Sequence, residues 1–235
     1  DEVAKIIKPG ITTKQIDDLC YEFINDNDAC SAPLFYRGFP KSCCTSTNHT
    51  ICHGIPGDKT LRDGDIVNVD VTTFKNGWHG DTSRMFYAGK VSIKAKKLID
   101  VTYNSMMKAI KILNKEITLG DIGSTIQTYV ESEGFSVVRD FCGHGIGKVF
   151  HQEPNILHYG KKGTGPKLIP GMIFTIEPMI NEGDYETKML NDGWTAVTKD
   201  KKLSAQFEHT VGITEKGYEI FTQSKKELNH PPYSV

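Results

Sequence analysis

The hydrophobic positions of the chain follow a helical period in three segments. The first predicts a helix over about 13–25, which Thr12 or Thr13 is placed to cap. Its apolar stripe consists of Ile16, Leu19, Cys20, Phe23 and Ile24. Two further helices are predicted over about 94–113 and 119–133. The residues up to Lys8 resemble the last turns of a helix that begins upstream of the printed sequence.

Between these helices, short apolar runs alternate with turn residues. The pattern predicts two strand-rich stretches, over 34–87 and 137–221. Asn76-Gly77 separates two of the runs and is a typical two-residue hairpin turn. The last residues, 226–235, contain Pro231-Pro232 and are predicted to form a loose tail.

Polar side chains share one face on each of three predicted strands, where burial favours apolar residues. In 67–72 the valines take the other face, because successive side chains of a strand alternate. The three polar sets are Asn68, Asp70 and Thr72, then Thr175 and Glu177, then Ser204, Gln206, Glu208 and Thr210. Buried carboxylates are costly unless protons or metal ions neutralise them. The pattern therefore predicts a metal site.

Asp81 and His144 extend this set of candidate ligands. Asp81 lies eleven residues after Asp70 with the hairpin turn between them, so both carboxylates return to one place. His144 stands in the glycine-rich run 142–147, where backbone or substrate can approach closely. A phosphate loop is a weak alternative, because neither GxGxxG nor GxxxxGKS/T occurs. Carboxylates with one imidazole suit Mn(II), Fe(II), Co(II) or Zn(II), and two such ions suit amide hydrolysis.

A repeat divides the chain into two halves. Leu61, Gly64 and Asp70 recur as Leu168, Gly171 and Glu177 at an offset of 107 residues. Upstream, Ile11-Thr12 and Ile16 recur as Ile117-Thr118 and Ile122 at an offset of 106 residues. Two matches at nearly one offset favour an internal duplication. The halves, about 1–90 and 91–225, are then related by a pseudo-twofold axis, and a site that they share lies near it.

Composition narrows the choice of partners. The 235 residues carry a formal net charge of -1, and Lys and Arg form only short clusters, which makes nucleic acid and membranes poor candidate partners. The six cysteines form no CxxC pair, which indicates reduced thiols in a cytoplasm. No stretch reaches the roughly 18 apolar residues of a membrane span.

Several short motifs together resemble one family. They are His53-Gly54-Ile55-Pro56, Gly80-Asp81-Thr82-Ser83, Gly143-His144-Gly145-Ile146-Gly147, Glu177-Pro178 and Phe207-Glu208-His209-Thr210. In their order and spacing they resemble the type I methionine aminopeptidases over nearly the whole chain. The resemblance implies an α+β pita-bread fold, with two pseudo-twofold-related halves, a curved antiparallel sheet and outer helices. It also implies a single catalytic domain over 1–235.

The resemblance assigns roles to residues of this sequence. The implied metal ligands, for two divalent ions, are Asp70, Asp81, His144, Glu177 and Glu208. His53 is implied to contact the amide at the scissile bond, and His151 to stabilise the oxyanion. Glu177 is implied to carry a proton from water to the leaving amine. The implied walls of the methionine pocket are Tyr36, Phe39, Cys44, Phe150 and Trp194. Pro33 stands where the family often has cysteine, and Phe39 where it often has tyrosine, which leaves the shape of the pocket open.

The implied function is removal of the initiator methionine from nascent chains, with a small second residue preferred. We expect a monomer in the cytoplasm, with methionyl peptides as substrates and the ribosome as an open partner. The alternatives are a proline-directed relative, such as a prolidase or aminopeptidase P, and an inactive binding module of the same fold. His49, His158, His209 and His230 are interpreted as structural, and His79 is left open because it lies two residues before Asp81.

Overall fold

The computed structural model describes residues 1–233 as three helices packed around one large curved sheet and two small ones. The helices are α1 (Thr13–Asp26), α2 (Ile93–Lys111) and α3 (Leu119–Ser132), and single 3-10 turns cover Val3–Lys5 and Tyr36–Gly38. The strands up to the helix pair are β1 (Cys30–Ser31), β2 (Cys44–Thr47), β3 (Thr50–Cys52), β4 (Asp65–Lys75) and β5 (Trp78–Ala88). Those after it are β6 (Ser136–Val137), β7 (Gly143–Gly145), β8 (Gln152–Ile156), β9 (Ile173–Ile176), β10 (Met179–Asn181), β11 (Thr187–Met189), β12 (Ala196–Thr198), β13 (Ser204–Gln206), β14 (Glu208–Thr214) and β15 (Gly217–Ile220).

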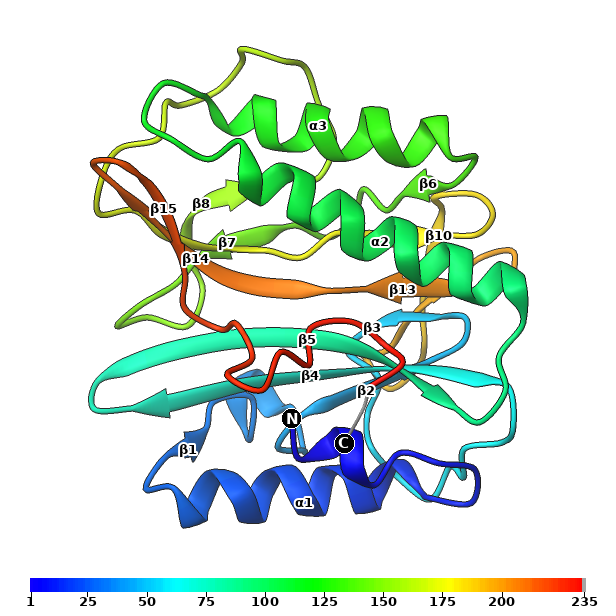
Figure 1. Ribbon diagram of the computed structural model, residues 1–235. Helices are drawn as coiled ribbons and strands as arrows, with labels where there is room; N and C mark the ends of the chain where they lie inside the picture. Colours follow the sequence, from blue (N-terminus) through cyan, green and yellow to red (C-terminus); the bar gives the residue numbers. More distant parts are fainter. Residues whose placement is uncertain (234–235) are drawn as a thin grey trace.

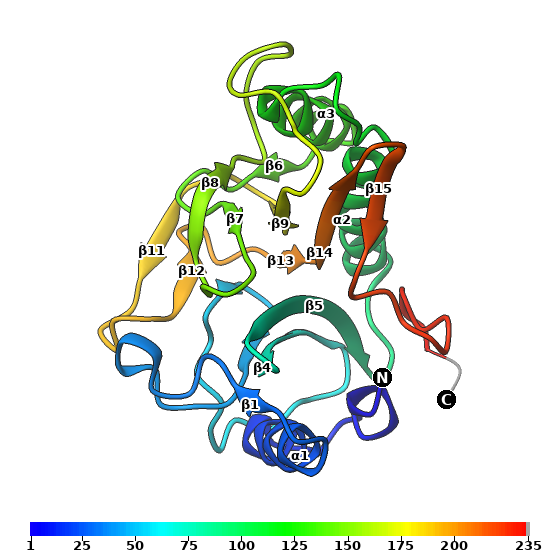
Figure 2. The ribbon, with the colours of Figure 1, turned by 90° about the vertical axis from the view of Figure 1, so that its left-hand side faces the viewer.

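The large sheet joins the two halves of the chain at its centre. Its nine strands follow the order β1-β4-β5-β14-β9-β7-β8, with β2 also on β4 and β15 also on β14. Figure 1 shows α1 below the β4–β5 hairpin and α2 and α3 above the strands of the second half. The view turned by 90° shows how strongly β4 and β5 curve (Figure 2). The neighbouring pair β5 and β14 is therefore the seam between the halves.

Each half has its own hydrophobic core. In the first half, Ile16 and Cys20 of α1 pack against Val67 and Val69 of β4. In the second half, α2 and α3 cover a larger cluster that includes Phe174 of β9. The valines of β4 face α1, which confirms the alternation expected from the sequence. None of the described helices is long and apolar enough to cross a membrane.

The repeat found in the sequence recurs as matching geometry. A lone bridge joins Thr12 to Thr60 before α1, and another joins Thr118 to Lys167 before α3. In both copies the residue before the helix donates its N–H to the side chain three positions on, at 2.9 Å in the first copy and 2.8 Å in the second. Gly64 and Gly171 have φ angles of +94° and +93°. The two halves are therefore built alike around the seam.

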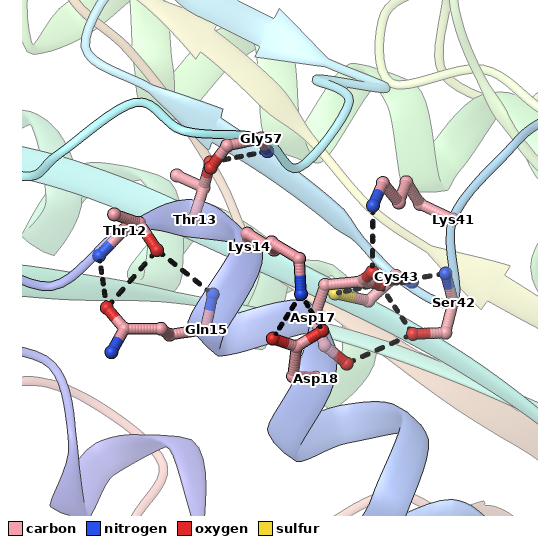
Figure 3. Close-up of polar contacts among 10 residues, drawn as sticks. All are labelled: Thr12, Thr13, Lys14, Gln15, Asp17, Asp18, Lys41, Ser42, Cys43 and Gly57. Carbon is pink, nitrogen blue, oxygen red and sulfur yellow. Dashed lines mark hydrogen bonds and ion pairs between the residues drawn. The ribbon is translucent and has the colours of Figure 1, made fainter.

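Helix α1 holds the segment that leads into β2, as Figure 3 shows. The buried carboxylate of Asp17 accepts hydrogen bonds from the N–H groups of Ser42, at 2.8 Å, and Cys43, at 3.2 Å. Lys41 lies 3.6 Å from the same carboxylate. Cys44, which follows Cys43, is the first residue of β2 and pairs with Asp70 of β4. A contact on α1 thus fixes one wall of the region around Asp70.

Three local expectations were wrong. The helical segment up to Lys8 is a single 3-10 turn over Val3–Lys5. Phe23 leaves the apolar stripe of α1 and is 49% exposed. The run that contains Glu208 is broken at Phe207, because β13 pairs with β10 whereas β14 pairs with β5 and β9.

The expected loose tail, 226–235, is packed over its described part, and residues 234–235 lie outside the described residues. The side chain of Leu228 is buried. The Tyr233 hydroxyl donates to the carbonyl of Met85 at 2.9 Å, and its ring lies 5.0 Å from that of Phe86. The tail is ordered because its apolar residues find a surface on β5, which the prolines alone do not reveal.

Candidate active site and metal centre

A cavity of about 380 Å³ lies at the seam between the halves. Every residue to which the sequence analysis gave a role in the site lines it: Tyr36, Phe39, Cys44, His53, Asp70, Asp81, His144, Phe150, His151, Glu177, Trp194 and Glu208. They come from β2, β4, β5, β7, β14 and the loops between strands. Residues far apart in the sequence therefore meet in one place.

The sheet register sets the positions of three carboxylates. Asp70 of β4 lies opposite Ser83 of β5, and Ser83 lies opposite Glu208 of β14. Asp81 precedes Ser83 by two residues, so it shares the face of that row. Strand pairing across β4, β5 and β14 thus gathers Asp70, Asp81 and Glu208 without help from any loop.

His144 of β7 and Glu177, the residue after β9, complete the candidate ligands around this row. Ligand atoms of Asp81, His144 and Glu208 all lie within 4.8 Å of one another. The Nε2 atom of His144 is 3.8 Å from Asp81 Oδ2 and 3.7 Å from Glu177 Oε1, which is too long for hydrogen bonds. The Nδ1–H of His144 donates to the Gly145 carbonyl at 3.1 Å, which leaves the lone pair of Nε2 facing the carboxylates.

Hydrogen bonds from neighbouring side chains orient the carboxylates. Thr72 donates to Asp81 Oδ1 at 2.7 Å. Thr175 donates to Glu177 Oε1 at 2.7 Å, and Gln206 donates to Glu177 Oε2 at 3.3 Å. These contacts orient two of the four carboxylates, those of Asp81 and Glu177.

Burial raises the pKa of all four carboxyl groups. The pKa of Asp70 is raised to about 7 and that of Glu177 to about 8, and the pKa values of Asp81 and Glu208 lie well above their usual range. Burial is the largest cause, and repulsion between the carboxylates adds to it. Among the described residues, no Lys or Arg forms an ion pair with any of the four carboxylates. This donor set therefore fits divalent cations, which supply the missing positive charge.

Two histidines, His53 and His151, also line the cavity. The ring of His53 meets Phe141 edge to face at 5.5 Å, and burial lowers its pKa. His151 Nδ1 is hydrogen-bonded to the Tyr36 hydroxyl at 3.1 Å, and its ring lies 4.2 Å from that of His144. Desolvation, with a smaller effect from His144, lowers the pKa of His151 to about 3. Both rings are therefore neutral near pH 7 and can each donate one N–H.

Aromatic rings form the apolar wall of the cavity. Phe39 meets Trp194 edge to face at 5.2 Å, and Tyr36 lies 4.9 Å from Phe150. Phe39 and Phe150 are buried, and the thiol of Cys44 is desolvated, which raises its pKa well above its usual range. The wall gives a long unbranched apolar side chain a place beside the carboxylates.

Sequence reasoning missed several residues at the site. Cys52, Phe141, Cys142 and Met179 also line the cavity, and the sequence analysis gave none of them a role there. His158, interpreted as structural, is fully buried and accepts a hydrogen bond of 3.1 Å from the N–H of Glu177. No sequence signal marks His158, because its role depends on a contact nineteen residues away.

Three other histidines contact residues that are not among the candidate metal ligands. His209 turns away from the cavity and is hydrogen-bonded to the hydroxyl of Thr222 at 2.9 Å. His230 pairs with Asp100 at 3.0 Å. His79 donates from Nδ1 to the Gly147 carbonyl at 2.9 Å and stacks on Phe150 at 5.5 Å, so it supports the wall from behind.

The chain matches metallopeptidase family M24 over residues 1–215. It therefore belongs to this family and, within it, to the methionine aminopeptidases, as its relatives indicate. A methionine aminopeptidase of Rickettsia prowazekii is 58% identical over 234 residues, which cover 99% of this chain and 90% of the relative. Methionine aminopeptidase A of Synechocystis is 55% identical over 223 residues, which cover 94% of this chain and 88% of the relative.

Solved structures agree on the fold. The crystal structure of the methionine aminopeptidase from Rickettsia prowazekii superposes with a TM-score of 0.94 over 94% of this chain and 90% of that one. A prolidase from Pyrococcus furiosus, 20% identical, gives a TM-score of 0.74 over 95% of this chain and 59% of its own. The pita-bread fold with two related halves is confirmed, and the prolidase shares that fold alone.

Proposed function

We propose that this chain removes the initiator methionine from proteins by hydrolysing the first peptide bond, with a small second residue preferred. The convergence of Asp81, His144 and Glu208 within 4.8 Å, beside an aromatic pocket, carries the proposal. Relatives that are 55–58% identical over nearly the whole chain are called methionine aminopeptidases, which supports the same activity here.

Five residues hold two divalent metal ions in this proposal. They are Asp70, Asp81, His144, Glu177 and Glu208, and the ions are Co(II), Mn(II), Fe(II) or Zn(II). When bound, two such ions lower the pKa of a shared water and polarise an amide carbonyl. The support lies in the four buried carboxylates with raised pKa values and in the free lone pair of His144.

Three residues carry the proton and the charge of the reaction in this proposal. Glu177 takes a proton from the attacking water and delivers it to the leaving amine, since its carboxylate is held by Thr175 and Gln206 at the edge of the cavity. His53 contacts the amide of the scissile bond. His151, whose Nδ1 accepts from the Tyr36 hydroxyl, donates its single N–H, on Nε2, to the developing oxyanion.

The aromatic wall selects the first side chain. Tyr36, Phe39, Cys44, Phe150 and Trp194 offer an apolar, closely lined pocket that suits the flexible side chain of methionine. Such a pocket discriminates by only about 1–3 kcal/mol per methylene. Residual cleavage of leucine or norleucine substrates is therefore expected.

The finer assignments extend this proposal. We infer one catalytic domain over 1–235, with halves of about 1–90 and 91–225, since the carboxylates come from both sides of the seam. We also infer a monomer that works on nascent chains in the cytoplasm, near or on the ribosome. The six free cysteines, three of them lining the cavity, are consistent with a reducing compartment.

Metal-loaded protein incubated with a Met-Ala-Ser peptide tests the proposed function. Free methionine is expected to appear with at least one of Mn(II), Fe(II), Co(II) and Zn(II), and a chelator is expected to abolish it. Glu177→Ala and His151→Ala should fold and lose most of their turnover, by about 10²-fold or more. Methionine release that is absent with every ion, or unaffected by chelator, contradicts the proposal.

Substrates that contain proline test the alternatives. A Gly-Pro dipeptide and an Xaa-Pro-Xaa peptide should not be cleaved, because the likeness to the prolidase is one of fold at 20% identity. Calorimetry with Mn(II) distinguishes an enzyme from an inactive binding module of the same fold. The enzyme should bind Mn(II), whereas the inactive module should bind no divalent metal.

A further inference from the structure

His158 lies in the loop that follows β8, and its side chain is buried with 1% of the residue exposed. Its Nε2 atom accepts a hydrogen bond of 3.1 Å from the backbone N–H of Glu177. A ring nitrogen that accepts carries no proton, so the imidazole is neutral with its proton on Nδ1. Within the described residues Nδ1 has no hydrogen-bond partner. The polar contact of this buried ring is therefore directed at Glu177.

The N–H of Glu177 needs such a partner because the strand ladder ends before it. Strand β9 pairs with β7 at one position, Gly145 with Phe174, among the described residues. Beyond it, the N–H of His144 donates to the Thr175 hydroxyl at 3.0 Å in place of a strand carbonyl. The His158 ring does the same for Glu177. An N–H removed from water without an acceptor is destabilising, so these two side-chain acceptors stabilise the end of the ladder.

Helix α3 fixes the loop that carries His158. A β-carbon on Gly123 of α3 would lie 2.4 Å from the Tyr159 carbonyl oxygen and 2.8 Å from that of Leu157, so only glycine allows this close approach. Just beyond, the N–H of Gly160 donates to the Gln127 side chain at 3.0 Å. The backbone on both sides of His158 thus lies against α3, which holds this loop in place.

We propose that His158 is a positioning residue that sets the backbone of Glu177 where β9 ends, and thereby the orientation of the Glu177 carboxylate in the metal site. The inference rests on the proposed role of Glu177 as a metal ligand and proton carrier. With its N–H held by His158, Glu177 meets Thr175 through Oε1 and Gln206 through Oε2. Residues that orient a ligand in this way affect metal affinity by about 10-fold to 100-fold.

A comparison of His158→Leu with His158→Gln tests the proposal. Leucine fills similar space without an acceptor, whereas the Oε1 atom of glutamine can accept the Glu177 N–H. For His158→Leu we expect Mn(II) binding, measured by calorimetry, to weaken by about 10-fold or more, and kcat for Met-Ala-Ser to fall by about 10-fold to 100-fold with KM unchanged. His158→Gln should retain wild-type Mn(II) affinity and kcat.

His230→Leu is the matched control, since it removes another histidine that contacts Asp100 and lies outside the cavity. It should leave Mn(II) affinity and kcat unchanged. Wild-type Mn(II) affinity in a folded His158→Leu, or a His158→Gln as impaired as His158→Leu, overturns the proposal, because packing alone then explains the residue. If wild-type protein binds Mn(II) but releases no methionine, the proposed function fails while the Mn(II) titrations still decide the role of His158.

A measurement on the unmodified protein keeps the test open if His158→Leu does not fold. Nitrogen-15 NMR of the histidine rings should show the His158 proton on Nδ1, and the amide of Glu177 should exchange slowly with solvent. A proton on Nε2, or fast exchange at Glu177, overturns the proposal.

Discussion

His53 has a left-handed backbone with φ of +56°, a conformation that residues with a β-carbon rarely adopt. Its neighbours impose this conformation: the N–H of Thr45 donates to the Gly54 carbonyl at 2.8 Å, and the N–H of Gly54 donates to Ser46 Oγ at 3.2 Å. Such strain costs on the order of 1 kcal/mol and collects at functional sites. At His53 it turns the ring toward Trp194 and Phe141 in the cavity.

Replacing His53 by asparagine should separate stability from activity. Asparagine tolerates the left-handed region, so His53→Asn is expected to unfold at a temperature no lower than wild type. It removes the imidazole from the scissile amide, so kcat for Met-Ala-Ser should fall by about 10²-fold. Thermal unfolding and a methionine release assay measure the two effects. Full activity in this variant excludes the role proposed for His53.

Strand pairing sets the positions of several side chains of the site. The β4–β5 hairpin turns at Asn76-Gly77 and sets Thr72 opposite Asp81, where the two side chains hydrogen-bond. Strand β2 pairs with β4 of this hairpin and lies against β3, and the loop after β3 passes close to β2. A β-carbon on Gly54 would lie 2.2 Å from the Thr45 carbonyl oxygen, whereas one on Gly57 would meet nothing within 4 Å.

Gly54→Ala and Gly57→Ala therefore form a matched pair. Gly54→Ala should force β2 away from the loop after β3 and destabilise the protein by about 1–3 kcal/mol, as overpacking does. At this chain length that lowers the unfolding temperature by about 2–4 °C per kcal/mol. Gly57→Ala should leave the unfolding temperature unchanged or slightly raised. Equal unfolding temperatures for the two variants contradict the close packing of β2 against this loop.

At the scale of the whole molecule, folding brings like charges together. The first half supplies Asp70 and Asp81, and the second supplies Glu177 and Glu208, so closing the seam gathers four carboxyl groups in one cavity, with Asp81 and Glu208 buried. A contact near the chain ends also joins the halves: the Ser224 hydroxyl donates to the side chain of Asp1 at 3.0 Å. Without metal, ionisation of the carboxyl groups destabilises the seam.

This linkage predicts how the stability of chelator-treated protein depends on pH. The pKa of Glu177 is about 8 in the folded protein against 4.5 for the free group, and that of Asp70 is about 7 against 3.8. Between these values the folded state holds protons that the unfolded state has released, so the free energy of unfolding falls as pH rises. Buried neutral histidines such as His158, with a pKa of about 3 against 6.5 for the free group, act in the opposite direction, and their effect fades over about one pH unit above 6.5. The carboxyl effect therefore dominates from about pH 7 to about pH 8.

Thermal unfolding of chelated protein from about pH 7 to about pH 8 should show a falling midpoint, since Asp70 and Glu177 lose their protons in this range while the free histidines are largely neutral. Mn(II) at about 100 times its dissociation constant should raise the free energy of unfolding by about 2.7 kcal/mol, and the midpoint should rise with it. Glu177→Gln, which cannot ionise, should show a smaller fall. A midpoint that rises across this window contradicts the burial of the carboxyl groups.

The local features of the site could be predicted from the sequence because short-range geometry determines them. The period of two placed Asp70 with Asn68 and Thr72, and the Asn76-Gly77 turn placed Asp81 beside them, as the register shows. Contacts over long separations could not be predicted in this way. The ring of His158, the packed tail and the exposed Phe23 depend on which surface each segment meets after folding.

The sequence by itself therefore determined the alternating faces of β4, the cap of α1, the turn of the hairpin and the repeat. Those properties follow from backbone period and local hydrogen bonding. Only the tertiary structure decided that β5 and β14 meet at the seam, which joins Asp70 and Asp81 to Glu177 and Glu208 in one cavity. Burial at that seam raises the carboxyl pKa values, because desolvation depends on the whole surrounding fold.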